Sequence, residues 1–265
     1  MLGRMLGVVA YVLVAATLAQ AEPVLIINGR SALSESPFVT DSVTAQLSAY
    51  HLLAGNTVTV ADAVPGDISG YSQVWDVRYS TAINGAEQSL YLSYLAAGGE
   101  MVVVGENSFY TTRNTSVLAF ISAAGGGTLA FVEPDSVQSV RPPFTGPDSV
   151  LNIGFQAPGG VTEFGTGDWI TRTADGTGGS GVVWSPGDLV NALDGTLLAL
   201  FDVDFLAGYA GAREQSLARN LVSFLSGEAQ EVPEPATIGL FGLGLCGLGL
   251  AWQKRRTAGS SRTGS

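Results

Sequence analysis

Short, mostly apolar or β-branched runs alternate with segments of helical periodicity through the first half of the chain. Such runs are typical of strands buried on both faces, and the periodic segments have the spacing of helices with one apolar face. The apolar runs predict strands at residues 24–27, 57–61, 74–77, 101–104 and 128–132. The periodic segments predict helices at 41–54, capped by Asp41, at 86–97, and from an Asn114 cap to Gly125.

The alternation stops at residues 133–195, which are rich in Gly, Pro, Asp and Thr. Strand-like pieces at 149–155, 167–172 and 181–184 predict an inserted antiparallel hairpin or small subsheet. A strand at 196–203 and a helix at 213–226 then restore the alternation. Strands that alternate with helices in this way indicate βαβ units. The predicted fold class is therefore α/β, with a doubly wound, mostly parallel sheet of flavodoxin-like type and a β-rich insertion.

The C-terminal end has another pattern, in which an uncharged apolar run separates a Pro-Glu-Pro tripeptide from a basic cluster. These parts are Pro233, Glu234 and Pro235, the run 236–252, and Lys254, Arg255 and Arg256. A helix of this length would span roughly 25 Å, against a hydrocarbon core of ~30 Å, so we expect a transmembrane helix. Because Lys and Arg resist translocation, the tail at 257–265 is expected in the cytoplasm.

The order of these parts over residues 232–256 resembles the PEP-CTERM sorting signal of Gram-negative bacteria. The resemblance implies that an exosortase, a membrane protease, removes the helix, usually in species that make exopolysaccharide. It further implies an inner-membrane anchor before processing, with the domain in the periplasm and later at the cell surface or in the extracellular matrix. An ordinary single-pass anchor is the alternative, although such an anchor has no need of Pro-Glu-Pro at its entrance.

The N-terminal end predicts export by a second signal. Arg4 precedes an apolar stretch at 6–18, and Ala19 and Ala21 form a small-x-small cleavage site. Residues 1–21 therefore read as a signal peptide, which implies signal peptidase and the general secretion machinery as partners.

These two signals divide the chain. The exported domain covers residues 22–227, and a linker at 228–232 leads to the sorting signal at 233–256.

The exported part is strongly acidic. Residues 22–234 hold all 23 acidic side chains but only seven arginines and no lysine, a formal net charge of −16. Such a surface repels nucleic acid phosphates and anionic lipid headgroups, so we expect no nucleic acid partner. It suits solubility outside the cell, and binding of divalent cations is left open.

Segments at 24–29, 94–107, 195–205 and 220–225 look like the class I glutamine-amidotransferase-like fold. An active member of that superfamily has a nucleophilic cysteine at a sharp turn after a central strand, and a histidine near the end of the domain. The matching turn here, at 105–108, holds Glu106 and no cysteine. The resemblance thus extends to the fold without its catalytic residues.

Nucleophilic and metal chemistry are limited by the residue counts. The only cysteine, Cys246, lies in the C-terminal apolar run, and the only histidine, His51, lies in the first predicted helix. A thiolate nucleophile needs a base beside it, so the amidotransferase reaction is excluded. No Gly-x-Ser-x-Gly elbow is present, and zinc with several His or Cys ligands is ruled out by count. We predict no metal and no cofactor.

Carboxylates are the remaining candidates for chemistry. Glu106 follows a strand at the position where open α/β sheets carry their working residues, and Asp76, Asp202 and Asp204 follow other strands in comparable positions. If Glu106 and Asp76 converged, they could bind a cation or perform acid–base work on a sugar. The favoured alternative is that they satisfy loop amides and cap helices.

Tryptophans offer a route to sugar binding by stacking. Trp169 and Trp184, in the β-rich insertion, are expected to be exposed, whereas Trp75 is expected in the core.

The sequence therefore favours a non-catalytic protein of the cell envelope or extracellular matrix, structural or binding, associated with exopolysaccharide. The alternative is a carboxylate-dependent hydrolase that acts on extracellular glycans through Glu106.

Overall fold

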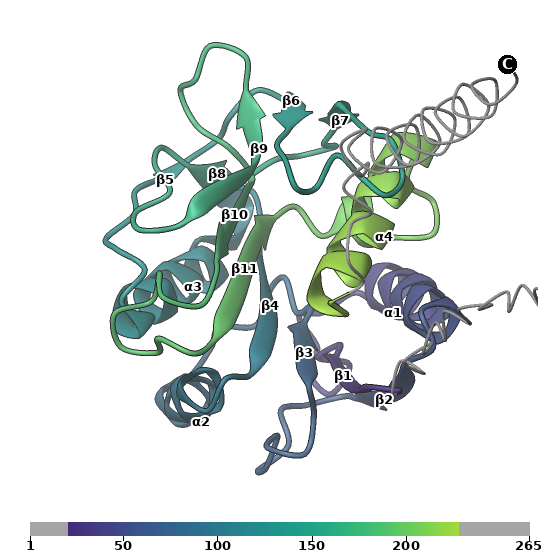
Figure 1. Ribbon diagram of the computed structural model, residues 1–265, viewed down its shortest axis with the longest axis vertical. Coiled ribbons are helices and arrows are strands. Elements are labelled where there is room, and N and C mark those ends of the chain that lie inside the picture. The colour runs from purple at the N-terminus through teal and green to yellow at the C-terminus, as the bar shows by residue number, and fades with distance from the viewer. Residues whose placement is uncertain (1–20, 228–265) are drawn as a thin grey trace, which may run out of the picture. The chain divides into compact units, whose positions relative to one another are not determined.

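The structure, a computed structural model, describes residues 21–227, and within them a nine-stranded sheet has helices on both faces (Figure 1). Five parallel strands lie in the order β2-β1-β3-β4-β11, which is the flavodoxin-like order with β11 in fifth place. Their bounds are β1 (Pro23–Ile27), β2 (Thr57–Ala61), β3 (Gln73–Asp76), β4 (Glu100–Gly105) and β11 (Thr196–Phe201). The α/β class is confirmed.

Two pairs of helices cover the two faces of the sheet (Figure 1). On one face, α1 (Pro37–Leu53) packs against α4 (Ala212–Leu225), and on the other α2 (Gly85–Ala96) contacts α3 (Thr111–Ala124). Each face has its own apolar core, because alternate residues of every parallel strand point to opposite sides. The connections leave β1 and β3 toward opposite faces, so the switch point of the sheet lies between these two strands.

The central strands form because nearly every residue in them can be buried on one face or the other. All six residues of β11 are buried, and it pairs along the whole length of β4. Full burial of one such Leu or Val side chain contributes ~1.5–3 kcal/mol. α2 begins where the sequence allows a reciprocal cap: the Asn84 side chain accepts from the Glu87 amide, and Glu87 accepts from the Asn84 amide.

The β-rich insertion differs from its predicted form. Its strands β10 (Gly181–Trp184), β9 (Asp168–Thr173), β6 (Val137–Val140) and β7 (Asn152–Gly154) continue the main sheet beyond β11, each antiparallel to its neighbour. The antiparallel character was predicted correctly, but the strands extend the central sheet and form no separate subsheet. β6 was not predicted, because it has only four residues and the two in its centre, Gln138 and Ser139, are polar.

The predicted fifth strand at 128–132 is correct only at its C-terminal end, and it does not join the main sheet. Only β5 (Phe131–Val132) is extended there, and it pairs with β8 (Gly160–Val161) in a small second sheet. β11 occupies the place beside β4 because its six buried residues match that strand, whereas Phe131 and Val132 are only half-buried.

Two helix starts and two exposures also need correction. α1 begins at Pro37, after Ser36, so Asp41 does not cap it, and Asn114 lies inside α3 as a buried residue. Trp169 and Trp184 are 8% and 0% exposed and offer no stacking surface, whereas Trp75 is in the core as expected. Aromatic side chains in an insertion were read as exposed, but here the insertion is part of the packed sheet.

Both ends of the described chain meet at the amino edge of the sheet. The Gln73 Nε2 group donates to Glu22 Oε2 at 3.0 Å and to Ser226 Oγ at 3.4 Å. The predicted signal peptide, linker, sorting residues, transmembrane helix and cytoplasmic tail lie almost wholly outside the described residues. Within residues 21–227 no helix has the length and apolar character needed to cross a bilayer.

Candidate functional site

The carboxyl edge of the parallel strands carries a set of buried carboxylates, one beyond each of four strands. Glu35 lies beyond β1, Asp76 ends β3, Glu106 follows β4, and Asp202 follows β11. Because the strands are parallel, these side chains share one edge of the sheet, where α/β proteins bind their ligands. Their partners differ, and the partners decide what each carboxylate can do.

Asp76 is held by arginines. Arg78 contacts both of its oxygens, through Nε at 2.8 Å and Nη2 at 2.7 Å, and Arg113 reaches Oδ2 at 3.4 Å. The Tyr91 hydroxyl donates to Oδ2 at 3.1 Å. Burial alone would raise the pKa of Asp76, but the charges of Arg113 and Arg78 outweigh it and hold the pKa at about 2. Asp76 is therefore a buried, fully paired anion.

Glu106 has no cation beside it. Its Oε2 accepts from the Val203 amide at 3.1 Å, and its Oε1 accepts from the amide and side chain of Asn107, both at 3.3 Å. Burial and the nearby Asp202 carboxylate raise the pKa of Glu106 to about 8, against the opposing effect of the amide donors. At neutral pH Glu106 thus carries a proton for most of the time.

Asp202 and Glu35 bind loops together through backbone amides. Asp202 accepts from Gln156 and Ala157 of the insertion at 2.9 and 3.2 Å, and from Asp204 at 2.9 Å. Burial, with the Asp204 charge, raises the pKa of Asp202 to about 6. Glu35 accepts from three consecutive amides of the loop after β3, those of Tyr79, Ser80 and Thr81. Asp202 thus joins the insertion to the segment after β11, and Glu35 joins the loop after β1 to the loop after β3.

The two predicted carboxylates do not form one pair. Asp76 contacts Arg78 and Arg113, while the acidic neighbours of Glu106 are Asp202 and Asp204. Arg113 lies between the ends of the two strands, since its Nε donates to the Val104 carbonyl at 2.6 Å and its Nη1 approaches Asp76.

The turn that would carry a nucleophile in the amidotransferase-like fold is closed over. The Asn114 side chain binds the backbone of this turn. It donates to the carbonyls of Glu106 and Asn107 at 2.7 and 2.9 Å and accepts from the Glu106 amide at 2.7 Å. The insertion packs on top: a Cβ atom on Gly159 would lie 2.1 Å from the Glu106 carbonyl oxygen. Only 3% of Glu106 is exposed. A substrate has no access to this carboxylate in the described conformation.

Exposed aromatic side chains lie at the same edge, and no sequence pattern distinguishes them from other aromatic residues. Phe38, at the start of α1, stacks on Tyr209, with ring centroids 5.5 Å apart and planes 12° apart. Phe109, in the short 3-10 helix η1 (Ser108–Tyr110) after β4, is 92% exposed. Tyr209 donates a hydrogen bond to Asp204, which lies in the 3-10 helix η2 (Asp204–Leu206). Single aromatic residues in the first turn of a helix or in a short 3-10 helix carry no spacing pattern, so only the structure brings these rings together.

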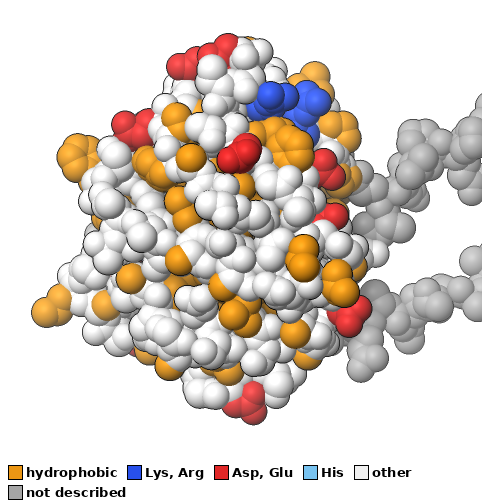
Figure 2. Space-filling view, turned by 90° about the vertical axis from the view of Figure 1, so that its left-hand side faces the viewer, with side chains coloured by type: hydrophobic (Ala, Val, Ile, Leu, Met, Phe, Trp, Pro, Cys, Tyr) orange, Lys and Arg blue, Asp and Glu red, His pale blue; other side chains and the backbone are white. Residues whose placement is uncertain are grey.

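The surface has few free cations to balance its acids. Arg78 and Arg113 are buried in the Asp76 site, while Arg30 pairs with Asp41 and Arg219 with Asp148. In Figure 2, carboxylates are spread over the face shown, and basic side chains gather only near its top. Among residues 21–227, no group of three or more His, Cys, Asp or Glu side chains has the arrangement of a metal site.

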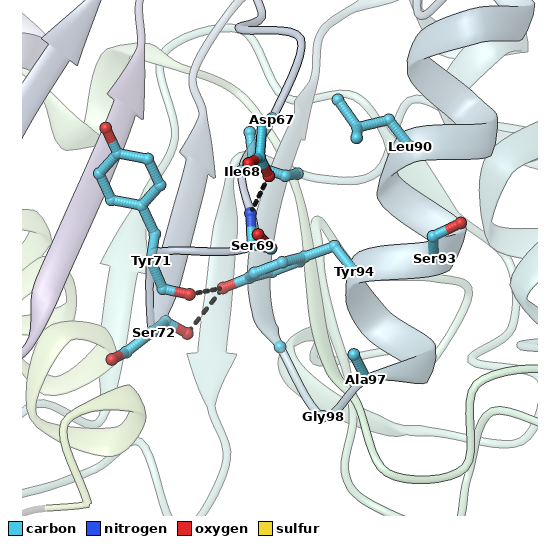
Figure 3. A pocket seen from close by; sticks show the side chains of 11 residues that line it. Asp67, Ile68, Ser69, Tyr71, Ser72, Leu90, Ser93, Tyr94, Ala97 and Gly98 are labelled. Atoms are coloured by element: carbon cyan, nitrogen blue, oxygen red, sulfur yellow. Dashed lines mark hydrogen bonds between the residues drawn. The ribbon is translucent and has the colours of Figure 1, made fainter.

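A hollow lies at the opposite, amino edge of the sheet (Figure 3). It has a volume of about 240 Å³ between the loop before β3 and the end of α2. The Tyr94 ring lies across it, held by its hydroxyl group, which donates to the Ser72 and Tyr71 carbonyls at 2.7 and 3.1 Å. The lining residues are Asp67, Ile68, Ser69, Tyr71, Ser72, Leu90, Ser93, Tyr94, Ala97, Gly98 and Gly99.

Comparison with protein families confirms the predicted sorting signal. Residues 231–256 match the PEP-CTERM protein-sorting motif. The motif implies export, membrane anchoring before sorting, and processing by an exosortase, which is a membrane protease. No curated protein matches the chain in sequence.

Solved structures show the fold of the domain. The mmIFT52 N-terminal domain shares 12% identity over 77% of this chain and 96% of its own, with a TM-score of 0.58. The putative ThuA-like protein from Bacteroides uniformis ATCC 8492 shares 14% identity over 80% of this chain and 94% of its own, at 0.50. The ThuA-like fold resembles the expected glutamine-amidotransferase-like fold.

A glycoside hydrolase contains a similar fold within a longer chain. The exo-β-1,4-mannosidase Op5Man5 from Opitutaceae bacterium strain TAV5 shares 11% identity over 76% of this chain, with a TM-score of 0.51. This chain covers only 35% of the mannosidase. At such identities the likeness concerns the fold alone.

Proposed function

We propose that the chain is a non-catalytic component of the cell envelope or extracellular matrix that binds exopolysaccharide after exosortase-type sorting. The observation that carries the proposal is the closure of the edge where catalysis would occur. Glu106 is buried beneath Gly159 with both oxygens engaged, and Asp76 is neutralised by two arginines. What the same edge offers to a ligand is exposed aromatic rings, which suit the apolar faces of sugars.

The sorting part of the proposal concerns partners and location. Signal peptidase and the secretion machinery would release the domain at Glu22, and an exosortase would cleave near Pro235. The domain would lie in the periplasm while anchored and at the surface or in the matrix afterwards. The basic cluster Lys254, Arg255 and Arg256 would hold the helix in place until cleavage.

Intact mass measurement of cell fractions tests the sorting part. Cleavage after Pro235 removes the last 30 residues. Replacing Lys254, Arg255 and Arg256 by glutamine, or deleting Pro233–Pro235, is expected to leave the unprocessed mass in the membrane fraction. Processing that continues unchanged in both variants would contradict it.

Retention of the purified chain on the host's own exopolysaccharide tests the binding part. Retention is expected, and it is measured over a range of calcium concentrations. No retention at any calcium concentration would defeat the proposal.

A second candidate function, a carboxylate-dependent glycan hydrolase, is favoured by one observation. The pKa of Glu106 is raised to about 8 by burial and by Asp202, as is required of a general acid. Release of reducing ends from the host polysaccharide, abolished by Glu106→Gln, would support this function and displace the first.

A further inference from the structure

One acidic residue at the carboxyl edge is unlike the others. Glu35, Glu106 and Asp202 each use both carboxylate oxygens to accept hydrogen bonds from loop amides. Asp204 accepts only from the Tyr209 hydroxyl, through Oδ1, and no donor within residues 21–227 reaches its Oδ2. Asp204 is also half-exposed, whereas the other three are buried. It is therefore the carboxylate of this group that keeps an acceptor available to solvent.

A pair of stacked aromatic rings lies beside the Asp204 carboxylate. Tyr209, which donates to Asp204, is 40% exposed and stacks on Phe38, which is 74% exposed. The loop that carries Tyr209 is tied to α1, because the Gly208 amide donates to Ser42 Oγ at 3.0 Å. Phe38 lies on the first turn of the same helix. A platform ordered before binding loses little conformational entropy when a ligand arrives.

The Tyr110 hydroxyl is a further polar group at this edge. Tyr110 packs edge-on against Tyr79, with centroids 5.2 Å apart. Burial raises the pKa of the Tyr110 hydroxyl, and Tyr79, Glu106 and Asp204 add to the rise. Within residues 21–227 this hydroxyl has no hydrogen-bond partner, so it can donate to a ligand near Asp204.

From these contacts we infer that Phe38, Tyr209 and Asp204 form a subsite for an uncharged hexose unit of a polysaccharide. The C–H face of a pyranose ring packs on an aromatic ring, and its hydroxyls donate to a carboxylate oxygen and accept from a phenol. The surrounding acids repel a polymer of uronic acids. The inference rests on the proposed function and narrows it to a residue set and a class of sugar.

Affinity electrophoresis of the full chain in mild detergent tests the subsite. Gels would contain the host polysaccharide, dextran, galactomannan or alginate. Retardation is expected on the host polysaccharide and on a neutral gel, and not on alginate. Phe38→Ala and Asp204→Asn are each expected to weaken binding roughly tenfold. Phe109→Ala is the matched control, since it removes an exposed ring from the same edge without touching the platform, and binding should change less than about twofold.

The outcomes separate the subsite from the proposed function. Retardation on neutral gels that survives both Phe38→Ala and Asp204→Asn would overturn the subsite and leave polysaccharide binding intact. Retardation on alginate alone would overturn the inferred sugar class. Failure to bind the host polysaccharide would overturn the proposed function itself. Phe38 is exposed and Asp204 is half-exposed, and thermal unfolding of each variant at the wild-type temperature would establish that it is folded.

Discussion

Asp76 and Glu106 stand at the ends of adjacent parallel strands and are both buried, yet Asp76 is ionised and Glu106 is protonated at neutral pH. Asp76 has two arginines against it and a pKa of about 2, whereas Glu106 has only amides and another acid and a pKa of about 8. Burial acts in the same direction on both. The difference comes from the cations, because a paired charge tolerates a low dielectric environment and an unpaired one takes up a proton.

The two regions therefore stabilise the edge in different ways. The Asp76 site is an ionic network that joins β3, β4, α2 and α3 through Arg78 and Arg113. The Glu106 and Asp202 region joins β4, β11 and the insertion through carboxylates that accept amide hydrogen bonds. The stability that the Asp76 network contributes should therefore be sensitive to removal of one ionic partner. The stability that the Glu106 and Asp202 region contributes should be sensitive to pH.

Removing one partner from the ionic network is expected to have the largest effect. Arg113→Met deletes a wholly buried guanidinium and leaves the Val104 and Thr81 carbonyls without their donor. Breaking a buried pair in this way costs ~3–5 kcal/mol of the free energy of unfolding. Urea unfolding of residues 22–227 at pH 7 measures it.

A double variant controls for simple loss of packing. Asp76→Asn with Arg113→Met removes both charges of one pair and keeps Arg78 paired with Glu87. Its loss of stability should be smaller than the sum of the two single losses. Strict additivity would mean that Asp76 and Arg113 do not interact energetically.

The Glu106 and Asp202 region is expected to make the domain less stable as the pH rises. Folded Glu106 keeps its proton up to a pKa of about 8, while in the unfolded chain the carboxyl ionises near 4.5. Between these values the unfolded state binds fewer protons, so the free energy of unfolding falls by up to ~1.4 kcal/mol per pH unit. Glu106→Gln should flatten this slope between pH 5 and pH 8.

The measured quantity is the pH slope of the free energy of unfolding and not its absolute value. Glu106→Gln also loses a hydrogen bond, because glutamine cannot accept from both the Val203 and Asn107 amides, and this loss lowers the stability at every pH. Asp202→Asn is a second test, because Asp202 has a pKa of about 6 and its charge also raises the pKa of Glu106. This variant should flatten the lower part of the window and move the upper limit of the window to lower pH. An unchanged slope in Glu106→Gln would show that Glu106 is ionised in the folded domain.

The strand and helix order of the parallel half could be predicted because burial on both faces leaves a clear apolar signature. Val102, Val103 and Val104 of β4 have this signature, and so does β11. β6 and β8 were missed since they are short or polar and depend on pairing with distant strands. The positions of Glu106 and Asp76 at one edge were also predictable from topology. Their partners were not, because Arg113 and Asp202 meet them only through packing of separate elements.

His51 provides a third kind of buried titratable group and a smaller, opposite effect. It lies against Trp75, with its Nδ1 atom 3.3 Å from Asn56 Nδ2, and burial lowers its pKa from 6.5 to about 4. Between these values the unfolded state binds more protons, so stability falls by up to ~1.4 kcal/mol per pH unit as the pH drops. His51→Gln should remove this acid-side loss, measured by unfolding between pH 4 and pH 6.5. Persistence of the loss would assign it to other groups.

The smallest effect is expected at a second arginine–aspartate ion pair, which is exposed to solvent where the pair of Arg113 and Asp76 is buried. Arg30 and Asp41 lie 3.2 Å apart with side chains 47% and 52% exposed. Water and salt screen such a pair, so Arg30→Gln should cost less than ~1 kcal/mol, and the difference should vanish in high salt. Equilibrium unfolding at low and high ionic strength measures both quantities. A loss comparable to that of Arg113→Met would mean that burial is not what distinguishes the two ion pairs, and that the loop after β1 depends on Arg30 in another way.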